Sequence, residues 1–164
     1  MLMPARQCRP EVGMLLLATL LLATGILVYA LDRGGAVYFL HGWTAAPAKT
    51  SIFVPLGDHL PTFLHTLVFI LITAAVLRPW RRLIPGICAA WLVIECLFEF
   101  GQMAPFDSRI AAAVPSWFES VPVLQITADY FIHGTYDALD IVSIVLGAVI
   151  AYPLVRIYLQ GDQS

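Results

Sequence analysis

Four long apolar stretches alternate with polar segments along the chain. They run from about Met14 to Leu31, Leu60 to Leu77, Leu83 to Phe100 and Leu139 to Tyr158. Each has roughly the 17–25 residues that a helix needs to cross the hydrocarbon core of a bilayer. Lipid offers no hydrogen-bond partners to open backbone groups, so each stretch is predicted to be helical. The pattern predicts an all-α polytopic membrane protein, a four-transmembrane-helix bundle.

The four spans are predicted to form one domain, residues 14–158, between short tails at residues 1–13 and 159–164. Pro85 falls in the first turn of the third span, where proline is tolerated, and Pro153 is a candidate kink in the fourth. The first span has an alternative interpretation as a signal peptide, because Arg6 and Arg9 precede it and Val28-Tyr29-Ala30 resembles a cleavage site. Its apolar run is longer than the roughly 7–15 residues usual in signal peptides, which favours an uncleaved helix.

Lysine and arginine residues set the predicted orientation. The side that holds the tails and the turn between the second and third spans has Arg6, Arg9, Arg78, Arg81, Arg82 and Arg156. The other side has Arg33, Lys49 and Arg109. Both termini are therefore predicted to face the cytoplasm. Aromatic residues in the outer segments Gly34–Pro47 and Pro115–Leu124 predict that these lie at the membrane interface. The alternative is that they cover a site.

Composition supports the membrane interpretation. Hydrophobic residues make up 60% of the 164 residues and charged residues 12%, whereas soluble domains carry about 25% charge. The formal net charge of −2 gives no basic field for nucleic acid, so no nucleic-acid partner is expected. Three cysteines without a CxxC pair argue against a thiolate metal or redox site.

Ionisable residues inside apolar spans are costly and are functional candidates by default. At the head of the second span, Asp58 and His65 are two helical turns apart on one face. Near the end of the third span, Glu95, Glu99 and Gln102 share a face by their i, i+4, i+7 spacing.

Asp137 and Asp140 at the head of the fourth span share a face in the same way. Under the predicted topology all three groups fall in the outer third of the membrane. The sequence therefore predicts one polar pocket open to the outer leaflet. It is built from His65, Glu95, Glu99, Gln102, Asp137 and Asp140. A stripe of Ser143, Gly147 and Ala151 continues the face of Asp140 and predicts close packing, with the fourth span at the centre.

Each polar residue also has a plain structural interpretation. Intramembrane polar groups can hydrogen-bond helices together, and Asp137 suits a helix N-cap. No HExxH or paired-histidine spacing is present, so neither a metal nor another cofactor is expected. His41, His59 and His133 are interpreted as loop or interface histidines, and Arg109 as a solvated loop residue or a contact for an anionic headgroup.

At these residues the chain resembles the VanZ-like family of small bacterial membrane proteins. The family pattern has an acidic residue and a histidine at the head of one span, Glu and Gln near the end of the next, and Asp-x-x-Asp at the head of the last. The matching residues are Asp58, His65, Glu99, Gln102, Asp137 and Asp140. Asp58-His59 stands where the family commonly has Asp-Lys, and the runs at residues 60–65 (LPTFLH) and 98–102 (FEFGQ) resemble a divergent branch of the family. The resemblance implies a bacterial inner-membrane protein with a role in the cell envelope.

Three functions remain open from the sequence. In the first, the site binds or acts on an envelope lipid or its headgroup, with His65, Glu99 and Asp140 as the catalytic or contact core. Asp58, Glu95, Gln102 and Asp137 would then support that core. In the second, the protein is a non-catalytic accessory or assembly protein whose polar cluster holds helices together. In the third, it is a small transporter or proton pathway. Membrane lipids are the expected partners, with a membrane protein or a second copy of this chain as further alternatives.

Overall fold

The computed structural model describes residues 9–32, 56–122 and 124–160, and this part of the chain forms helices and contains no strand. The four long helices are α1 (Pro10–Asp32), α2 (Leu56–Val76), α3 (Ile84–Gly101) and α6 (Ala138–Gln160). All four are long and apolar enough to cross a membrane. The predicted all-α bundle of four spans is therefore confirmed, and the predicted interfacial segment at residues 34–47 lies outside the described residues.

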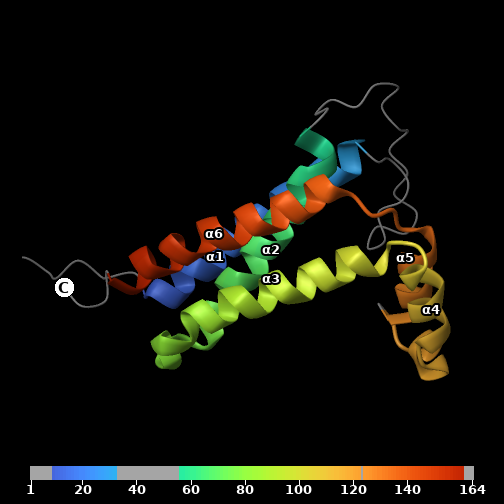
Figure 1. The fold of residues 1–164 in the computed structure, drawn as a ribbon. Coiled ribbons are helices and arrows are strands. Elements are labelled where there is room, and N and C mark those ends of the chain that lie inside the picture. Colours follow the sequence, from blue (N-terminus) through green and yellow to red (C-terminus); the bar gives the residue numbers. More distant parts are fainter. Residues whose placement is uncertain (1–8, 33–55, 123, 161–164) are drawn as a thin grey trace, which may run out of the picture.

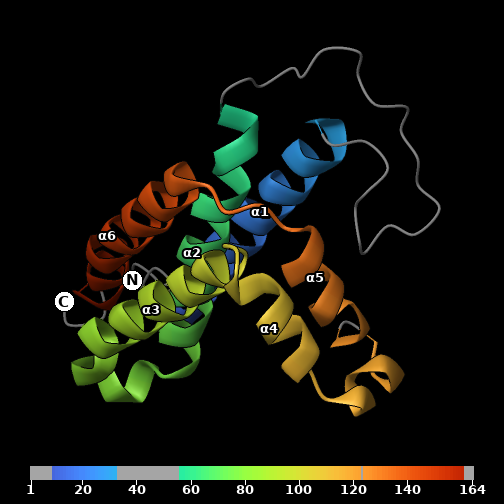
Figure 2. The same ribbon diagram turned by 45° about the vertical axis from the view of Figure 1, so that its right-hand side comes forward.

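Helix α2 is at the centre of the bundle. It packs against α1, α3 and α6. Of its most apolar stretch, 44% is buried inside the protein, compared with 28% for the corresponding stretch of α6. Figures 1 and 2 show α1 and α6 beside α2, with α3 along another side. Helix α6, the fourth span, also contacts all three other long helices, but a smaller share of it is buried than of α2.

The predicted small-residue stripe of α6 meets α2 directly. Ala151 is fully buried. A Cβ atom added to Gly147 would come within 2.8 Å of the Phe63 carbonyl oxygen and 3.1 Å of the Thr66 Cβ atom. The two helices run in the same direction, and this contact brings their backbones close together. It fixes the relative positions of the polar residues at the heads of α2 and α6. Pro153 lies within α6, which continues through it to Gln160.

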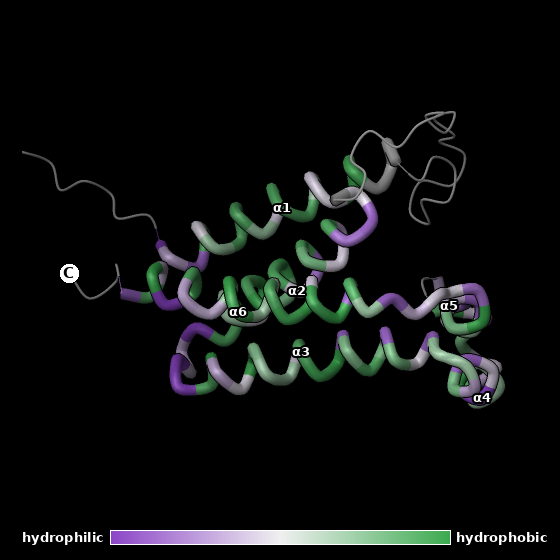
Figure 3. The backbone as a smooth tube through the Cα atoms, turned by 45° about the horizontal axis from the view of Figure 1, so that its top comes forward, coloured by the Kyte–Doolittle hydropathy of each residue, from purple (hydrophilic) through white to green (hydrophobic). Residues whose placement is uncertain are grey.

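One end of the bundle is basic. The 3-10 helix η2 (Arg78–Leu83) connects α2 to α3, and Pro85 lies in the first turn of α3 as predicted. An Arg78 Nη1 atom lies 2.6 Å from Glu11 Oε2 on α1, and Arg81 Nη1 donates to the Leu159 carbonyl of α6 at 3.2 Å. The start of α1, the η2 turn and the end of α6 therefore lie together (Figure 3).

The connection from α3 to α6 lies at the other end of the bundle. It contains α4 (Phe106–Ala113), η3 (Ser116–Ser120), η4 (Leu124–Ile126) and α5 (Thr127–His133). Helices α4 and α5 pack on each other at the end of α3 (Figure 2). The sequence did not predict these short helices, because a helix of about two turns shows little hydrophobic periodicity. Their position matters because α5 supplies one wall of the site.

Candidate functional site

Polar side chains join the helices in pairs at the end where α2 and α6 begin and α3 ends. Between α2 and α6, His59 Nδ1 lies 3.0 Å from Asp140 Oδ1. Between α2 and α3, His65 Nδ1 lies 3.2 Å from Glu95 Oε1. The two histidines of α2 thus contact two different neighbouring helices.

Helical geometry explains this division. Residues seven apart lie on nearly the same face of a helix, so His59 shares a face with Thr66, which contacts Gly147 of α6. His65 is six residues after His59 and is therefore turned by about a third of a circle, toward α3. Close packing of α2 on α6 brings His59 to Asp140, and packing of α2 on α3 brings His65 to Glu95.

Glu99 links α3 to the head of α6. Its side chain is buried, with 7% exposure, and its Oε1 accepts a hydrogen bond from the Asp137 backbone N–H at 2.7 Å. Asp137 Oδ1 in turn accepts the Leu139 N–H at 2.8 Å, which is the N-cap arrangement expected of an aspartate at this position. Glu99 therefore fixes where α6 begins, and one function of this carboxylate is structural.

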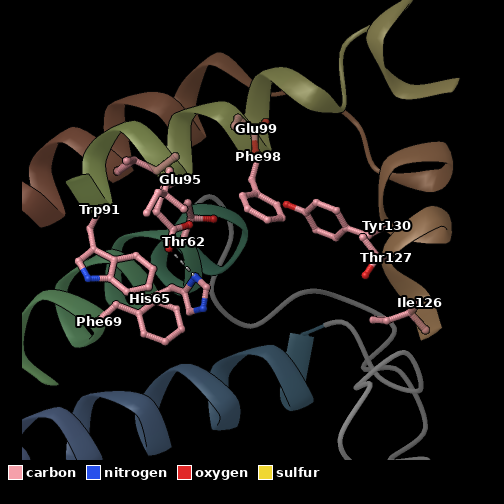
Figure 4. A pocket seen from close by; sticks show the side chains of 12 residues that line it. Thr62, His65, Phe69, Trp91, Glu95, Phe98, Glu99, Ile126, Thr127 and Tyr130 are labelled. Carbon is pink, nitrogen blue, oxygen red and sulfur yellow. Dashed lines mark ion pairs between the residues drawn. The ribbon is translucent and has the colours of Figure 1, made fainter. Parts of the chain in front are cut away.

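A cavity of about 430 Å³ lies between α2, α3, α5 and α6 beside these pairs. Figure 4 shows the side chains of its walls. The lining residues are Thr62, His65, Phe69, Trp91, Ile94, Glu95, Phe98, Glu99, Ile126, Thr127, Tyr130 and Ile144. Two carboxylates, one imidazole and three hydroxyl groups thus face a space that is otherwise apolar and aromatic.

Aromatic rings form the wall that is deeper in the bundle. The Phe69 and Trp91 rings stack with centroids 4.5 Å apart, and the His65 ring meets the Phe69 ring edge-on at 4.2 Å. Trp91 Nε1 donates to Thr73 Oγ1 at 2.9 Å, which fixes the indole between α2 and α3. These contacts hold the His65 imidazole in place next to the Glu95 carboxylate.

The opposite wall comes from α5. Tyr130 meets the Phe98 ring edge-on at 6.0 Å, and its hydroxyl oxygen accepts a hydrogen bond from Gln102 Nε2 at 2.7 Å. Desolvation of the phenol, with a further contribution from the Glu99, Glu95 and Asp140 charges, raises the pKa of Tyr130 to about 12. The hydroxyl therefore keeps its proton at neutral pH and can donate a hydrogen bond into the cavity.

The structure divides the predicted site residues into two sets. His65, Glu95 and Glu99 line the cavity, and Gln102 contacts Tyr130 in its wall. Asp137 and Asp140 lie beside the cavity without lining it.

The proposed core of His65, Glu99 and Asp140 does not form one hydrogen-bonded chain, because each of the three contacts a different partner. Asp58, the remaining supporting residue, lies in the first turn of α2 and has an interaction partner.

Several residues of the site were not identified from the sequence. His59 was interpreted as a loop or interface histidine, but it begins the α2 face that packs on α6 and contacts Asp140. The sequence did contain a signal for this position, because His59 lies seven residues before Thr66 and therefore on the same face of the helix. Tyr130 and Thr127 had no such signal, because α5 was not predicted. Within the described residues no group of three or more His, Cys, Asp or Glu side chains is arranged to hold a metal ion.

The arrangement can bind a group that donates hydrogen bonds. Glu95 and Glu99 offer acceptor oxygens, and the stacked Phe69 and Trp91 rings form an apolar wall of the same space. His65 beside Glu95 is also a geometry in which a proton can move between an imidazole and a carboxylate.

Comparison of the chain with protein-family models, curated proteins and solved structures finds no match.

Proposed function

We propose that this chain is a VanZ-like protein of the bacterial cytoplasmic (inner) membrane that binds an envelope lipid through its headgroup. The observation that carries the proposal is the 430 Å³ cavity, where Glu95, Glu99 and His65 meet aromatic walls at one end of an apolar bundle. A lipid fits both properties of this place. Its headgroup matches the polar lining, and its acyl chains match the exposed apolar surface of helices such as α3.

The cavity favours a headgroup that carries an ammonium group with N–H donors. Two carboxylates and an imidazole supply acceptors, and hydrogen bonds to charged groups are stronger than those between neutral groups. A headgroup with only phosphate oxygens to offer would instead meet the negative charge of Glu95 and Glu99.

The arginine distribution supports a cavity on the outer side of the membrane. The η2 turn, the start of α1 and the end of α6 lie at the basic end of the bundle, whereas the cavity is near the opposite end. Under the positive-inside rule the basic end faces the cytoplasm. The proposed site then opens toward the headgroups of the outer leaflet.

Calorimetric titration of the purified full chain with short-chain phosphatidylethanolamine tests this function. Phosphatidylcholine of the same chain length is the comparison, because its methylated ammonium has no N–H donor. We expect saturable binding of phosphatidylethanolamine and binding of phosphatidylcholine weaker by about tenfold or more, since a hydrogen bond to a charged group contributes about 1.5–3 kcal/mol.

Two variants locate the binding. Glu99→Gln keeps an oxygen that can accept the Asp137 N–H and removes the charge, and we expect affinity to fall by about tenfold or more. Glu119→Gln is the matched control, because Glu119 is exposed in η3 and does not line the cavity. Equal binding of the two lipids, or equal loss in both variants, would refute lipid recognition at this site.

A specific observation favours the accessory or assembly role as the second candidate. Among the described residues, every buried side-chain nitrogen or oxygen has a hydrogen-bond partner, so the polar pairs can serve to hold helices together. In that case Glu99→Gln and Asp140→Asn lower the amount of folded protein in the membrane. Lipid affinity per folded molecule stays unchanged, which distinguishes this role from headgroup binding.

A further inference from the structure

A second cavity, of about 360 Å³, lies at the basic end of the bundle. It is bounded by the η2 turn, the first turn of α3 and the last turns of α6. Its lining consists of Arg81, Arg82, Ile84, Pro85, Tyr152, Arg156, Leu159 and Gln160. This cavity is separate from the proposed headgroup site, with which it shares no residue.

The lining is strongly positive. Among the described residues around this cavity there are three arginines and neither an aspartate nor a glutamate. Glu11, an acidic residue at the same end, contacts Arg78 at 2.6 Å, and Arg78 does not line the cavity. Arginine presents several N–H donors in a planar fork that matches the oxygens of a phosphate group.

Contacts within the protein shape this basic lining. Arg81 donates to the Leu159 carbonyl at 3.2 Å and joins η2 to the end of α6. Arg156 lies along its own helix, with Nη1 3.3 Å from the Tyr152 hydroxyl and its guanidinium 5.8 Å from the centre of that ring. Arg82 is exposed beside them. Arg82 and Arg156 are therefore the side chains placed to contact a ligand.

The apolar surroundings of the cavity identify the kind of ligand. Leu83 and Ile157, next to the cavity in sequence, are 50% and 63% exposed, and Ile84, Pro85 and Leu159 form part of the lining itself. Guanidinium groups beside exposed apolar side chains occur where a membrane protein meets lipid headgroups. A soluble phosphate compound would use only the arginines, whereas a phospholipid uses both surfaces.

We propose that this basic cavity binds the phosphate group of an anionic phospholipid. Arg82 and Arg156 contact the phosphate, and the acyl chains lie along the apolar surface of α3 and α6. Under the orientation proposed above, the lipid belongs to the inner leaflet. The site would tie the η2 turn to the end of α6 and stabilise the bundle whenever the lipid is bound.

The test is the thermal unfolding midpoint of the full chain in neutral detergent, titrated with phosphatidylglycerol, phosphatidylcholine or inorganic phosphate. We expect a saturable rise with phosphatidylglycerol alone. A similar rise with phosphatidylcholine would show that charge is not recognised and would overturn the proposal. An equal rise with inorganic phosphate at the same concentration would identify a soluble ligand and would also overturn it.

Variants separate this cavity from general attraction between a basic protein end and an anionic lipid. Changing both Arg82 and Arg156 to Gln should weaken the apparent affinity for phosphatidylglycerol by about 30-fold, and Arg82→Gln alone by about fivefold. Arg9→Gln removes the same charge at the same end of the bundle but outside the lining, so it should change the affinity by less than about twofold.

The single variant Arg82→Gln is expected to fold normally, because this exposed side chain can change without disturbing the core. A loss of affinity in this variant therefore reports on the binding site. Equal loss of affinity in Arg9→Gln and Arg82→Gln would contradict a specific site. The two proposals can fail separately, since the two cavities share no residues. The effect of Glu99→Gln on phosphatidylethanolamine binding does not change the result expected for phosphatidylglycerol at the basic cavity.

Discussion

Gly147 is the point where the packing of the bundle can be tested most sharply. A Cβ atom at this position would approach the Phe63 carbonyl oxygen to 2.8 Å, the Thr66 Cβ to 3.1 Å and the Leu67 nitrogen to 3.5 Å. Two of these atoms belong to the backbone of α2 and cannot rotate away. Gly147→Ala therefore requires α6 and α2 to move apart.

The size of the effect follows from two opposing contributions. Forcing a methyl group into a packed interface costs about 1–3 kcal/mol. Alanine has a better helix propensity than glycine by about 1 kcal/mol, which offsets part of that cost. The free energy of unfolding should therefore fall by about 1 kcal/mol in Gly147→Ala.

Gly86→Ala is the matched control. Gly86 lies in α3, and an added Cβ there would meet no atom within 4 Å. The same substitution should leave stability unchanged or raise it by up to about 1 kcal/mol. Because helix propensity enters both variants, the difference between them isolates the clash and should be about 1–3 kcal/mol.

Equilibrium unfolding in mixed dodecyl maltoside and SDS micelles, followed by far-ultraviolet circular dichroism, measures this difference. Two variants of equal stability, within about 0.5 kcal/mol, would refute the close contact of α6 with α2. The placement of His59 beside Asp140 would then lose its structural basis, since it depends on the same contact.

Three further predictions concern the site. Trp91→Phe should lower the free energy of unfolding by about 0.6 kcal/mol, because it removes the hydrogen bond to Thr73 and keeps a ring against Phe69; denaturant unfolding measures it. A double-mutant cycle of His59→Ala and Asp140→Ala should give a coupling energy of about 0.6–1.7 kcal/mol, and a value near zero would contradict their contact. The raised pKa of Tyr130 should make stability fall as pH rises from about 10 to about 12, and Tyr130→Phe should remove that dependence in pH-dependent unfolding curves.

The sequence predicted the long helices well because each is a continuous apolar run with clear breaks. The turn around Arg78–Leu83 and the first-turn Pro85 lie where expected. Helix α1 begins at Pro10, before the predicted Met14, and Glu11 in its first turn contacts Arg78. A helix can therefore extend beyond its apolar run and include charged residues, which the apolar pattern alone does not predict.

The contacts of the site were less predictable, because helical spacing gives the face of a residue but not the helix that this face meets. Spacing placed Glu95 and Glu99 on one face of α3, and both line the cavity. The partner of each histidine depends on how α2 packs between α3 and α6, which is a tertiary property. The wall formed by Tyr130 depends on α5, which is too short to show a periodic pattern.

The central proposal is that a lipid ammonium group lies against the carboxylates of the 430 Å³ cavity. Solid-state NMR in lipid bilayers can measure the distance from a ¹⁵N-labelled phosphatidylethanolamine headgroup to the ¹³C-labelled side-chain carboxyl carbons of Glu95 and Glu99. We predict a dipolar coupling that corresponds to about 4 Å, the distance of an ammonium hydrogen-bonded to a carboxylate. Absence of that coupling in wild-type protein, or an equal coupling to the ¹³C-labelled carboxyl carbon of Glu119, which does not line the cavity, would contradict headgroup binding at this site.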